Sequence, residues 1–436
     1  MTDKENKSRF TPDHVRSIVA SSISRRGRKE NMFQWFGKVS VLVAVSFLVL
    51  MLFTILTKGL PGFFQYYVKL DVVLDKERLD PRADGSSQSI YEGDYRSAVR
   101  ESLFEVLNPS GRKEKKEAGK IISSAAEEFL RAYVLSKPEN LGTTQTIWFV
   151  VDDDTDSFLR GFIDRNSPQS ERPRFSDLRI KFVDDLQEAD RISYRFSEYL
   201  IFGSASRDPE MAGIWGALVG SVLTLSVCLA IAFPMGVATA IYLEEIAPKN
   251  RITELIEVNI NNLAAVPSVV FGIMGLAIFI NFFGLPRSIP LVGGLVLALM
   301  TLPTIIISSR AAIRAVPPSI RDGALAVGAS KMQTIFHHVI PLAMPGMLTG
   351  TIIGMAQALG ETAPLLMIGM VAFVVDIPGD IVTPSTVLPV QIFMWADEAE
   401  RMFVHKTSAA ILVLLIFLIG MNSVAVFLRK HLERRW

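Results

Sequence analysis

Residues 211–243 read MAGIWGALVGSVLTLSVCLAIAFPMGVATAIYL, a run of 33 residues without a charged side chain. At a rise of 1.5 Å per residue, about 20 apolar residues are enough for a helix to cross the roughly 30 Å hydrocarbon core of a bilayer. Five further stretches are similar, the last interrupted by two histidines and one glutamate: Val39–Thr57, Val258–Pro286, Ser288–Ser309, Thr407–Leu428 and Met332–Val375. The sequence therefore predicts an all-α polytopic membrane protein with six transmembrane helices and excludes a single soluble globule.

These runs divide the chain into a tail, an anchored outer segment and a helical core. We expect a basic tail over residues 1–35, a first transmembrane helix over 36–57, an extracytoplasmic domain over 58–210 and a core over 211–436. The first run ends in TKGLP instead of a small-residue cleavage site, which indicates an uncleaved anchor. The core helices are expected at about 213–243, 258–282, 288–313, 343–374 and 407–428, with a loop over 314–341.

The basic residues are unevenly distributed between the two sides of the expected bundle. Nineteen of the 45 Lys and Arg residues lie in the two terminal segments and in two of the short loops, and only three lie in the short loops on the other side. Because an excess of Lys and Arg marks the cytoplasmic side, we expect both termini to be cytoplasmic. The outer segment holds 23 basic and 28 acidic residues, a composition typical of a water-soluble domain.

Within the outer segment, helix and strand patterns both occur. Tyr95–Leu107 and Lys113–Leu135 have the apolar spacing of helices, whereas Thr146–Val151 and Leu178–Val183 are rich in strand-forming residues, the latter with strict alternation. The one cysteine of the chain, Cys228, lies outside this segment, so no disulfide can hold the domain together. We expect an inserted α+β domain that is stabilised by its own apolar core.

Three aspartates at alternate positions, Asp152, Asp154 and Asp156, follow the first expected strand. A twelve-residue calcium loop requires glycine at its sixth position and glutamate at its twelfth, but Ser157 and Ile163 occupy these places. A solvated turn from strand to helix is the favoured interpretation, and no metal site is predicted.

The sequence lacks the motifs of a nucleotide-hydrolysing or zinc-dependent enzyme. There is no G-x-x-x-x-G-K-[ST] phosphate loop, no H-E-x-x-H and no C-x-x-C. We therefore expect no enzymatic activity and no cofactor in this chain.

Residues 310–341 form the most informative short loop and read RAAIRAVPPSIRDGALAVGASKMQTIFHHVIP. The pattern predicts two short helices joined by a turn. Ser319 with Asp322, and Ser330 with Gln333, have the spacing of residues that cap helix N-termini.

The second of these helices carries one apolar stripe that is expected to end at Pro341. Its members have the spacing i, i+3, i+4, i+7 and i+8: Met332, Ile335, Phe336, Val339 and Ile340. Such a stripe either packs against its own bundle or docks into a groove on a partner, and periodicity alone leaves both interpretations open.

The spacing of this loop resembles the EAA loop of ABC-importer permeases. Asp322-Gly323-Ala324, then Gly328, then Val339-Ile340-Pro341 match its pattern, with Asp in place of Glu and Gly in place of the first Ala. The resemblance implies that the loop inserts into a cleft of a cytoplasmic ATPase subunit. On this basis the coupling residues are Ser319, Asp322, Gly323, Ala324, Gly328, Met332 and Phe336.

Two further motifs narrow the resemblance. Gly360-Glu361-Thr362-Ala363-Pro364-Leu365-Leu366, together with Ala265–Ser268 and Phe271-Gly272, resembles the PstA-type permeases of phosphate importers. This resemblance covers residues 211 to the C-terminus and implies a MetI-like core of five helices, to which the first helix and the outer domain are an addition.

The chain departs from the family pattern at two positions. Gln357 stands where many relatives carry an arginine, and the basic residue late in the fourth expected helix is Arg310. The residues assigned to the substrate pathway are Glu361, Thr362, Gln357, Arg310, Asn262 and Ser268.

Glu361 is the acidic residue in the expected fifth helix, and an unpaired carboxylate costs roughly 3 kcal/mol in hydrocarbon. It requires a partner, which is either a structural one on a neighbouring helix or a cation in the pathway. Gly360 and Pro364 are expected to loosen the helix around it, and Pro267-Ser268 to break the third helix. Broken helices expose N–H groups that bind oxyanions, although Pro and Gly are also common in ordinary membrane helices.

The resemblance implies a permease subunit of a phosphate importer in a bacterial inner membrane, with residues 58–210 periplasmic. The implied partners are a cytoplasmic ATPase, a PstC-like second permease or a second copy of the chain, an extracytoplasmic phosphate-binding protein and membrane lipid, with no nucleic acid. The alternatives are a permease for sulfate or molybdate and, from another class, a membrane-anchored sensor. The sensor is disfavoured because few residues follow the last expected helix.

Overall fold

The computed structural model describes residues 12–371 and 373–432, and it divides into two compact units, residues 1–57 and 58–436. From residue 12 onward the first unit consists of one helix, α1 (Pro12–Gly59), whose last two residues belong to the second unit. The basic tail expected over residues 1–35 is therefore not separate from the first transmembrane helix, because one helix runs through both from Pro12 onward. The first 11 residues lie outside the described part. The helix continues because no proline interrupts it after residue 12, and Asp13 is favourable in its first turn.

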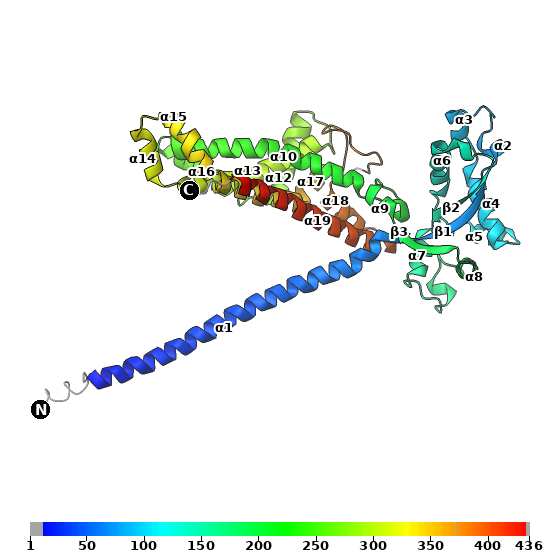
Figure 1. The fold of residues 1–436 in the computed structure, drawn as a ribbon, viewed down its shortest axis with the longest axis horizontal. Helices are drawn as coiled ribbons and strands as arrows, with labels where there is room; N and C mark the ends of the chain where they lie inside the picture. The colour runs from blue at the N-terminus through cyan, green and yellow to red at the C-terminus, as the bar shows by residue number, and fades with distance from the viewer. Residues whose placement is uncertain (1–11, 372, 433–436) are drawn as a thin grey trace. The chain divides into compact units, whose positions relative to one another are not determined.

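The second unit contains a bundle of long apolar helices (Figure 1). Counting α1, five helices among the described residues have the length and composition to cross a membrane, and the number is six if one bent pair of helices is counted as a single span. The bundle elements are α10 (Trp215–Ile241) with a π-helical end (Tyr242–Ile246), α11 (Arg251–Leu263), α12 (Ser268–Gly275) with a π-helical end (Leu276–Phe282), α13 (Pro290–Arg314), α16 (Ile340–Gly360) and α19 (Arg401–Leu432).

The direction of each helix follows from close contacts at glycines. A side chain on Gly294 of α13 would lie 2.5 Å from Val227 of α10, and one on Gly236 of α10 would lie 2.6 Å from Ile305 of α13. The residue numbers therefore increase in the same direction along both helices, so α10 and α13 run parallel. The chain must return between them, so the pair α11 and α12, bent by 102°, carries it back across the bundle. This geometry agrees with the six predicted crossings.

The remaining bundle helices complete an alternating arrangement. On α16, Gly350 lies against Ser308 of α13, and α16 runs antiparallel to α13 because Thr301 and Ile305 lie near Gly354. The bundle thus has two ends. We call the end with Trp215, Pro290, Gly360 and Arg401 the domain end, and the opposite end the coupling end.

The fifth expected helix, over residues 343–374, is displaced in the structure. The helical run covers residues 331–360, through Pro341, and stops at Gly360, so the prediction of a helix to residue 374 is wrong. A short helix, α17 (Ala363–Met367), and an irregular segment follow, in which residue 372 lies outside the described part; α18 (Leu388–Ala396) comes next.

The outer domain is built on an antiparallel three-stranded sheet in the order β2-β1-β3, with its own apolar core. Tyr67 of β1 lies opposite Val150 of β2, and Phe64 of β1 lies opposite Phe196 of β3. Its elements are η2 (Leu60–Phe63), β1 (Phe64–Val73), α2 (Lys76–Leu79), α3 (Ser87–Tyr91), α4 (Tyr95–Leu107), α5 (Arg112–Ala118), α6 (Ala126–Ser136), η3 (Pro138–Asn140), β2 (Thr144–Val150), α7 (Asp153–Leu159), η4 (Gln169–Glu171), α8 (Asp177–Glu188), β3 (Ile192–Phe196), α9 (Glu198–Phe202) and η5 (Pro209–Met211). The α+β class is confirmed.

Two local predictions in the outer domain are wrong. Leu178–Val183 lies in helix α8, whose buried residues Arg179, Phe182, Val183 and Leu186 have helical spacing and whose N-terminus is capped by Ser176. The alternation in this stretch is too short to outweigh the helical pattern that continues beyond it.

The other error is the single helix expected over Lys113–Leu135. The structure has α5 and α6 instead, separated by a segment in which Ile122 forms a bridge with Val151 of the sheet. The predictions of a helix over Tyr95–Leu107 and a strand near Thr146–Val151 are confirmed by α4 and β2.

Candidate functional site: coupling helices and a broken pathway

The coupling end carries the two predicted short helices, α14 (Pro318–Ala326) and α15 (Lys331–Thr334), at the opposite end of the bundle from the outer domain (Figure 1). Gly328 lies between them with φ of 93°, a conformation that favours glycine. The predicted capping box at α15 is confirmed, since Ser330 N–H donates to the Gln333 side chain at 2.8 Å. The Ser319 cap is wrong: α14 begins at Pro318 and has no side-chain cap.

The sequence left open whether the apolar stripe of the second helix packs against the bundle or is available to a partner. In the structure, part of the stripe is buried against the bundle and part is exposed. Ile335 and Val339 are buried in a cluster with Ala240 and Met347, so they pack against the bundle. Phe336, like Met332, remains about half exposed. The helix does not end at Pro341, because proline is tolerated near the start of α16 and the run continues through it.

The exposed apolar residues of this region extend beyond the predicted ones. Leu325 and Val327, on the α14 side of the turn, are 50% and 84% exposed. We call Leu325, Val327, Met332 and Phe336 the coupling patch. Among the other predicted coupling residues, Ser319, Asp322, Gly323 and Gly328 are exposed, whereas Ala324 is buried. Sequence reasoning missed Leu325 and Val327 because they fall outside the stripe.

A network of ion pairs holds the coupling end together. The buried Arg310 side chain donates from Nε to Glu244 at 2.5 Å and pairs through Nη2 with Glu257 at 2.7 Å, which joins α13 to the end of α10 and to α11. Arg314 also pairs with Glu244, at 2.8 Å, but is largely exposed. Arg310 is therefore fully engaged inside this chain.

A second pair attaches α14 to the bundle. Arg321 lies 2.7 Å from Glu245 and also donates to the carbonyl oxygens of Ile313 and Val316, at 2.9 and 2.6 Å. These carbonyls are at the C-terminal end of α13, where backbone acceptors lack helical partners and a cation is favoured. The arginine thus fixes α14 relative to both α10 and α13.

The predicted pathway carboxylate lies where α16 ends. Glu361 is the first non-helical residue after Gly360, and Thr362 precedes α17. Gln357 is one turn before Glu361 and is exposed. No hydrogen bond or ion pair to the Glu361 carboxylate occurs among residues 12–371 and 373–432.

The two breaks identified in the sequence come together in the structure. A side chain on Gly272 of α12 would lie 2.7 Å from the Pro364 Cα of α17, so the two backbones are in direct contact. Ser268, the first residue of α12, is one turn from this contact, and Glu361 is three residues from it in the chain. Asn262 lies before the bend, near the exposed end of α11.

Arg310 and Glu361 are not neighbours. On the facing helices α13 and α16, Ser308 contacts Gly350 and Ala312 contacts Gly346, which places Arg310 level with residue 348. Glu361 follows 13 positions later, roughly 20 Å along the helix axis. The structure therefore assigns these two members of the predicted pathway set to different ends of the bundle.

At the domain end, the outer domain is attached to α19. The buried Lys406 Nζ donates to the carbonyl oxygens of Glu210 and Ala212, at 3.2 and 2.7 Å. The His405 ring stacks on Phe162 with centroids 4.9 Å apart. These contacts connect the loop before α10, the outer domain and the last membrane helix.

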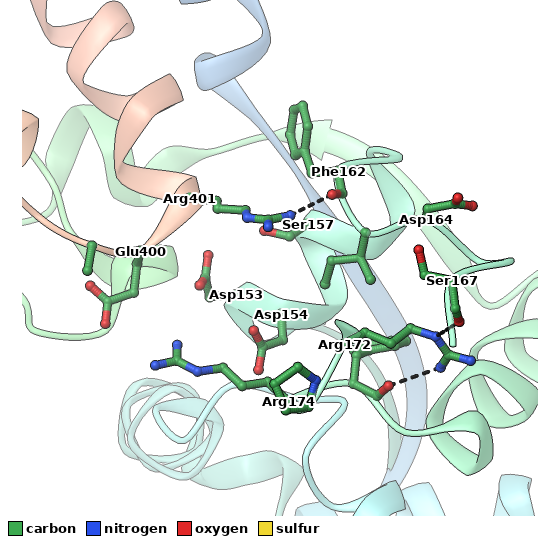
Figure 2. Close-up of a pocket in the computed structure, with 14 residues that line it drawn as sticks. Asp153, Asp154, Ser157, Phe162, Asp164, Ser167, Arg172, Arg174, Glu400 and Arg401 are labelled. Carbon is green, nitrogen blue, oxygen red and sulfur yellow. Dashed lines mark hydrogen bonds between the residues drawn. The ribbon is translucent and has the colours of Figure 1, made fainter. Parts of the chain in front are cut away.

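Beside this junction is a cavity of about 430 Å³ with charged walls (Figure 2). Asp153, Asp154 and Glu400 line it together with Arg174 and Arg401, and the Arg401 guanidinium donates to the Phe162 carbonyl oxygen at 2.5 Å. Burial, reinforced by the charge of Asp154, raises the pKa of Asp153 to about 7.

The three spaced aspartates of the sequence begin α7. Asp152 accepts a hydrogen bond from Asp154 N–H at 3.3 Å and caps this helix, which confirms the turn from strand to helix. The expectation that this turn is solvated is wrong, because Asp156 is buried and Asp152 and Asp154 are partly buried. The buried Arg179 lies 3.7 Å from Asp152 and 3.8 Å from Asp154. Asp156 forms an ion pair with Arg160, and it accepts from Tyr66 N–H at 3.0 Å.

Residues 232–436 match the family model of the binding-protein-dependent transport system inner membrane component, and residues 20–169 match a domain of unknown function, DUF3333. The chain is 30% identical to the phosphate transport system permease protein PstA 1 of Mycobacterium tuberculosis, over 51% of this chain and 72% of that protein. It belongs to the ABC-importer permease family. The permease is also 30% identical to PstC of Haemophilus influenzae, over 48% of this chain and 73% of that protein.

Other similarities are narrower. The permease is 35% identical to the probable ABC transporter permease protein YqgI of Bacillus subtilis, over 35% of this chain, and it spans about half (52%) of that protein's length. A solved MetNI methionine ABC transporter in an inward-facing conformation has a TM-score of 0.40 and 15% identity, over 51% of this chain and 94% of that one.

Proposed function

We propose that the chain is the transmembrane permease subunit of an ATP-driven importer of inorganic phosphate. The observation that carries the proposal is that both helix breaks, which meet at Gly272 and Pro364, fall within the region matched by the importer-permease model. The substrate is taken from the relatives, several of which are named phosphate transport permeases. Transport proceeds by alternating access and forms no covalent intermediate.

In this proposal ATP is hydrolysed on a separate cytoplasmic subunit, because the sequence has no phosphate loop of its own. The coupling patch provides the apolar surface that enters a groove of that subunit. Arg321 transmits movement of α14 to α10 and α13 through its contacts with Glu245 and the end of α13. An extracytoplasmic binding protein delivers the anion at the domain end.

The partner of Glu361 then comes from outside this chain. A second permease, either a PstC-like subunit or another copy, supplies the other wall of the pathway and the cation that meets the carboxylate. Hydrogen phosphate is repelled by a bare carboxylate, so Glu361 holds that cation in place and does not bind the anion alone. Thr362, Gln357, Asn262 and Ser268 line the same region as polar groups, whereas Arg310 acts at the coupling end.

The proposed topology places both termini in the cytoplasm and residues 58–210 in the periplasm of a bacterial inner membrane. Epitope tags at Ser86 and Ser170 are expected to be accessible in intact spheroplasts, and a tag at residue 20 to be protected. Protection of Ser86 under these conditions would show that the orientation is wrong.

The functional test is uptake of radiolabelled phosphate in a strain that lacks its other phosphate importers. Uptake should require this chain, and purification of the chain should bring an ATPase subunit with it. If sulfate or molybdate uptake requires the chain and phosphate uptake does not, the substrate is another oxyanion. If no uptake depends on the chain, a sensor role replaces transport.

A further inference from the structure

The outer domain contains a second cavity, of about 360 Å³, which shares no lining residue with the cavity beside the α19 junction. Its walls are one face of α4, the segment between α5 and α6, and the first turn of α6. The floor is apolar, with Val99, Leu103 and Ile122, and the rim is polar. This volume corresponds to roughly a dozen water molecules, enough for a small hydrated ion.

Two exposed arginines of the rim have no hydrogen-bonded or ion-paired partner in the described part of the chain, although the charge of Arg96 helps to lower the pKa of Asp94. Arg96 and Arg100 are one turn apart on α4, and neither guanidinium forms a hydrogen bond, an ion pair or a ring contact among the described residues. Like charges at this spacing are unfavourable on a helix unless something neutralises them. Several other arginines of the same domain are paired, such as Arg78 with Glu101 and Arg82 with Glu92.

The rim holds more donors, and two of its charged groups are already matched. Lys120 pairs with Glu117 at 2.7 Å, and Asp152 lies 3.7 Å from the buried Arg179. Burial and the neighbouring Glu210 raise the pKa of Asp152 to about 7, which reduces its negative charge near neutral pH. The Ser124 hydroxyl already donates to Asp208 at 2.8 Å, and the Ser123 hydroxyl forms a hydrogen bond with Glu210, so the two arginines are the free charged donors of the rim. Glu127 is the remaining carboxylate of the lining.

We propose that this cavity binds a tetrahedral oxyanion that carries an acidic O–H group, such as hydrogen phosphate. Arg96 and Arg100 present planar, charged donors to the anion oxygens, the arrangement that gives strong charge-assisted hydrogen bonds. Glu127 accepts from the O–H of hydrogen phosphate, whereas fully ionised sulfate has no proton to donate and is repelled. The proposed binding follows from the residues of the cavity alone. That the anion binds here before it is transported rests on the proposed function, which places the outer domain on the periplasmic side.

The test is isothermal titration calorimetry of the full-length chain in lipid nanodiscs with potassium phosphate at neutral pH. The wild type should bind phosphate saturably and more tightly than sulfate. Replacing both Arg96→Gln and Arg100→Gln should weaken binding by roughly a hundredfold, since two charge-assisted contacts are lost. The paired change Arg96→Lys with Arg100→Lys should retain part of the affinity, and Arg82→Gln, at an exposed arginine outside the cavity, should retain all of it.

Thermal unfolding of each variant, together with the single Arg96→Gln and Arg100→Gln changes, shows whether the fold survives. The proposal is overturned if the wild type binds no phosphate saturably, if the double glutamine variant binds as tightly as the wild type, or if sulfate binds equally well. Chain-dependent phosphate uptake without phosphate binding to this cavity would refute this inference alone. Binding without chain-dependent uptake would refute the proposed function and leave the cavity site standing.

Discussion

The coupling end and the helix break at Glu361 differ in whether their charged side chains have ion-pair partners within the chain. At the coupling end, Arg310 is buried between Glu244 and Glu257 of its own chain, and Arg321 is held by Glu245. At the break, the described part of the chain offers the Glu361 carboxylate no ion pair. A complete internal network fixes a shape, whereas a charge without an internal partner depends on another molecule. We therefore regard the first region as a connector, and we predict that the second is where the chain meets its substrate or its partner.

The largest effect is expected from breaking the connector. Arg310→Gln leaves Glu244 and Glu257 facing each other without their central cation and should lower the free energy of unfolding by about 3 kcal/mol. Arg314→Gln is the matched control, because this arginine pairs with the same Glu244 but is exposed, and it should cost less than about 1 kcal/mol. Denaturation of the two purified variants in detergent measures the difference. If both variants lose the same free energy of unfolding, the burial of Arg310 does not make its ion pairs stronger than that of the exposed Arg314.

A smaller effect is expected from a charge introduced into the coupling patch, which should weaken retention of the ATPase subunit. Phe336→Asp introduces a carboxylate into the coupling patch, and desolvating it in an apolar groove should reduce retention of the ATPase subunit by about tenfold. His338→Asp adds the same charge to an exposed position of the same helix, outside the patch. Co-purification from membranes measures retention. If both variants keep the ATPase equally well, the patch is not the docking surface.

The smallest effect concerns the junction at the domain end. The pKa of Asp153 rises from 3.8 to about 7, because burial disfavours its charged form, so the folded state binds more protons than the unfolded state in this interval. Stability should therefore fall as the pH increases from about 4 to about 7. Asp153→Asn removes this loss and should be more stable than the wild type by about 1 kcal/mol at pH 8, with no difference at pH 4.

Asp164→Asn, at an exposed carboxylate that lines the same cavity, is the control for this pH dependence. Thermal unfolding across the pH range measures both variants. If Asp153→Asn follows the wild-type pH profile, the ionisation of this carboxylate has no part in the stability of the junction.

Features set by neighbouring residues were predictable from the sequence. The long uncharged runs predicted the membrane helices, and the Ser330 to Gln333 spacing predicted a capping box that the structure contains. The break at Pro267 was also predicted, since proline interrupts a helix through its own backbone chemistry. At Gly360 only a loosening of the helix was predicted, and the structure ends the helix there.

Features that depend on distant residues were not predictable. The ion pairs of Arg310 were not predicted, because its partners, Glu244 and Glu257, lie 66 and 53 positions earlier in the sequence and meet it only through the packing of α10, α11 and α13. Strands β1 and β3 were missed for the same reason: their pairing joins Phe64 to Phe196 across most of the outer domain. The assignments of Glu361, Thr362, Gln357, Asn262 and Ser268 to the pathway stay predictions.

The most direct test is to measure phosphate uptake and thermal unfolding together in Glu361→Gln, expressed with its partner subunits. The account predicts uptake reduced by roughly a hundredfold, with unfolding and ATPase retention as in the wild type, because no internal cation is left unpaired. Replacing the partner's cation with a neutral residue should restore part of the uptake. Normal uptake in Glu361→Gln, or a loss of stability comparable to that of Arg310→Gln, would contradict the claim that the carboxylate acts through a partner outside this chain.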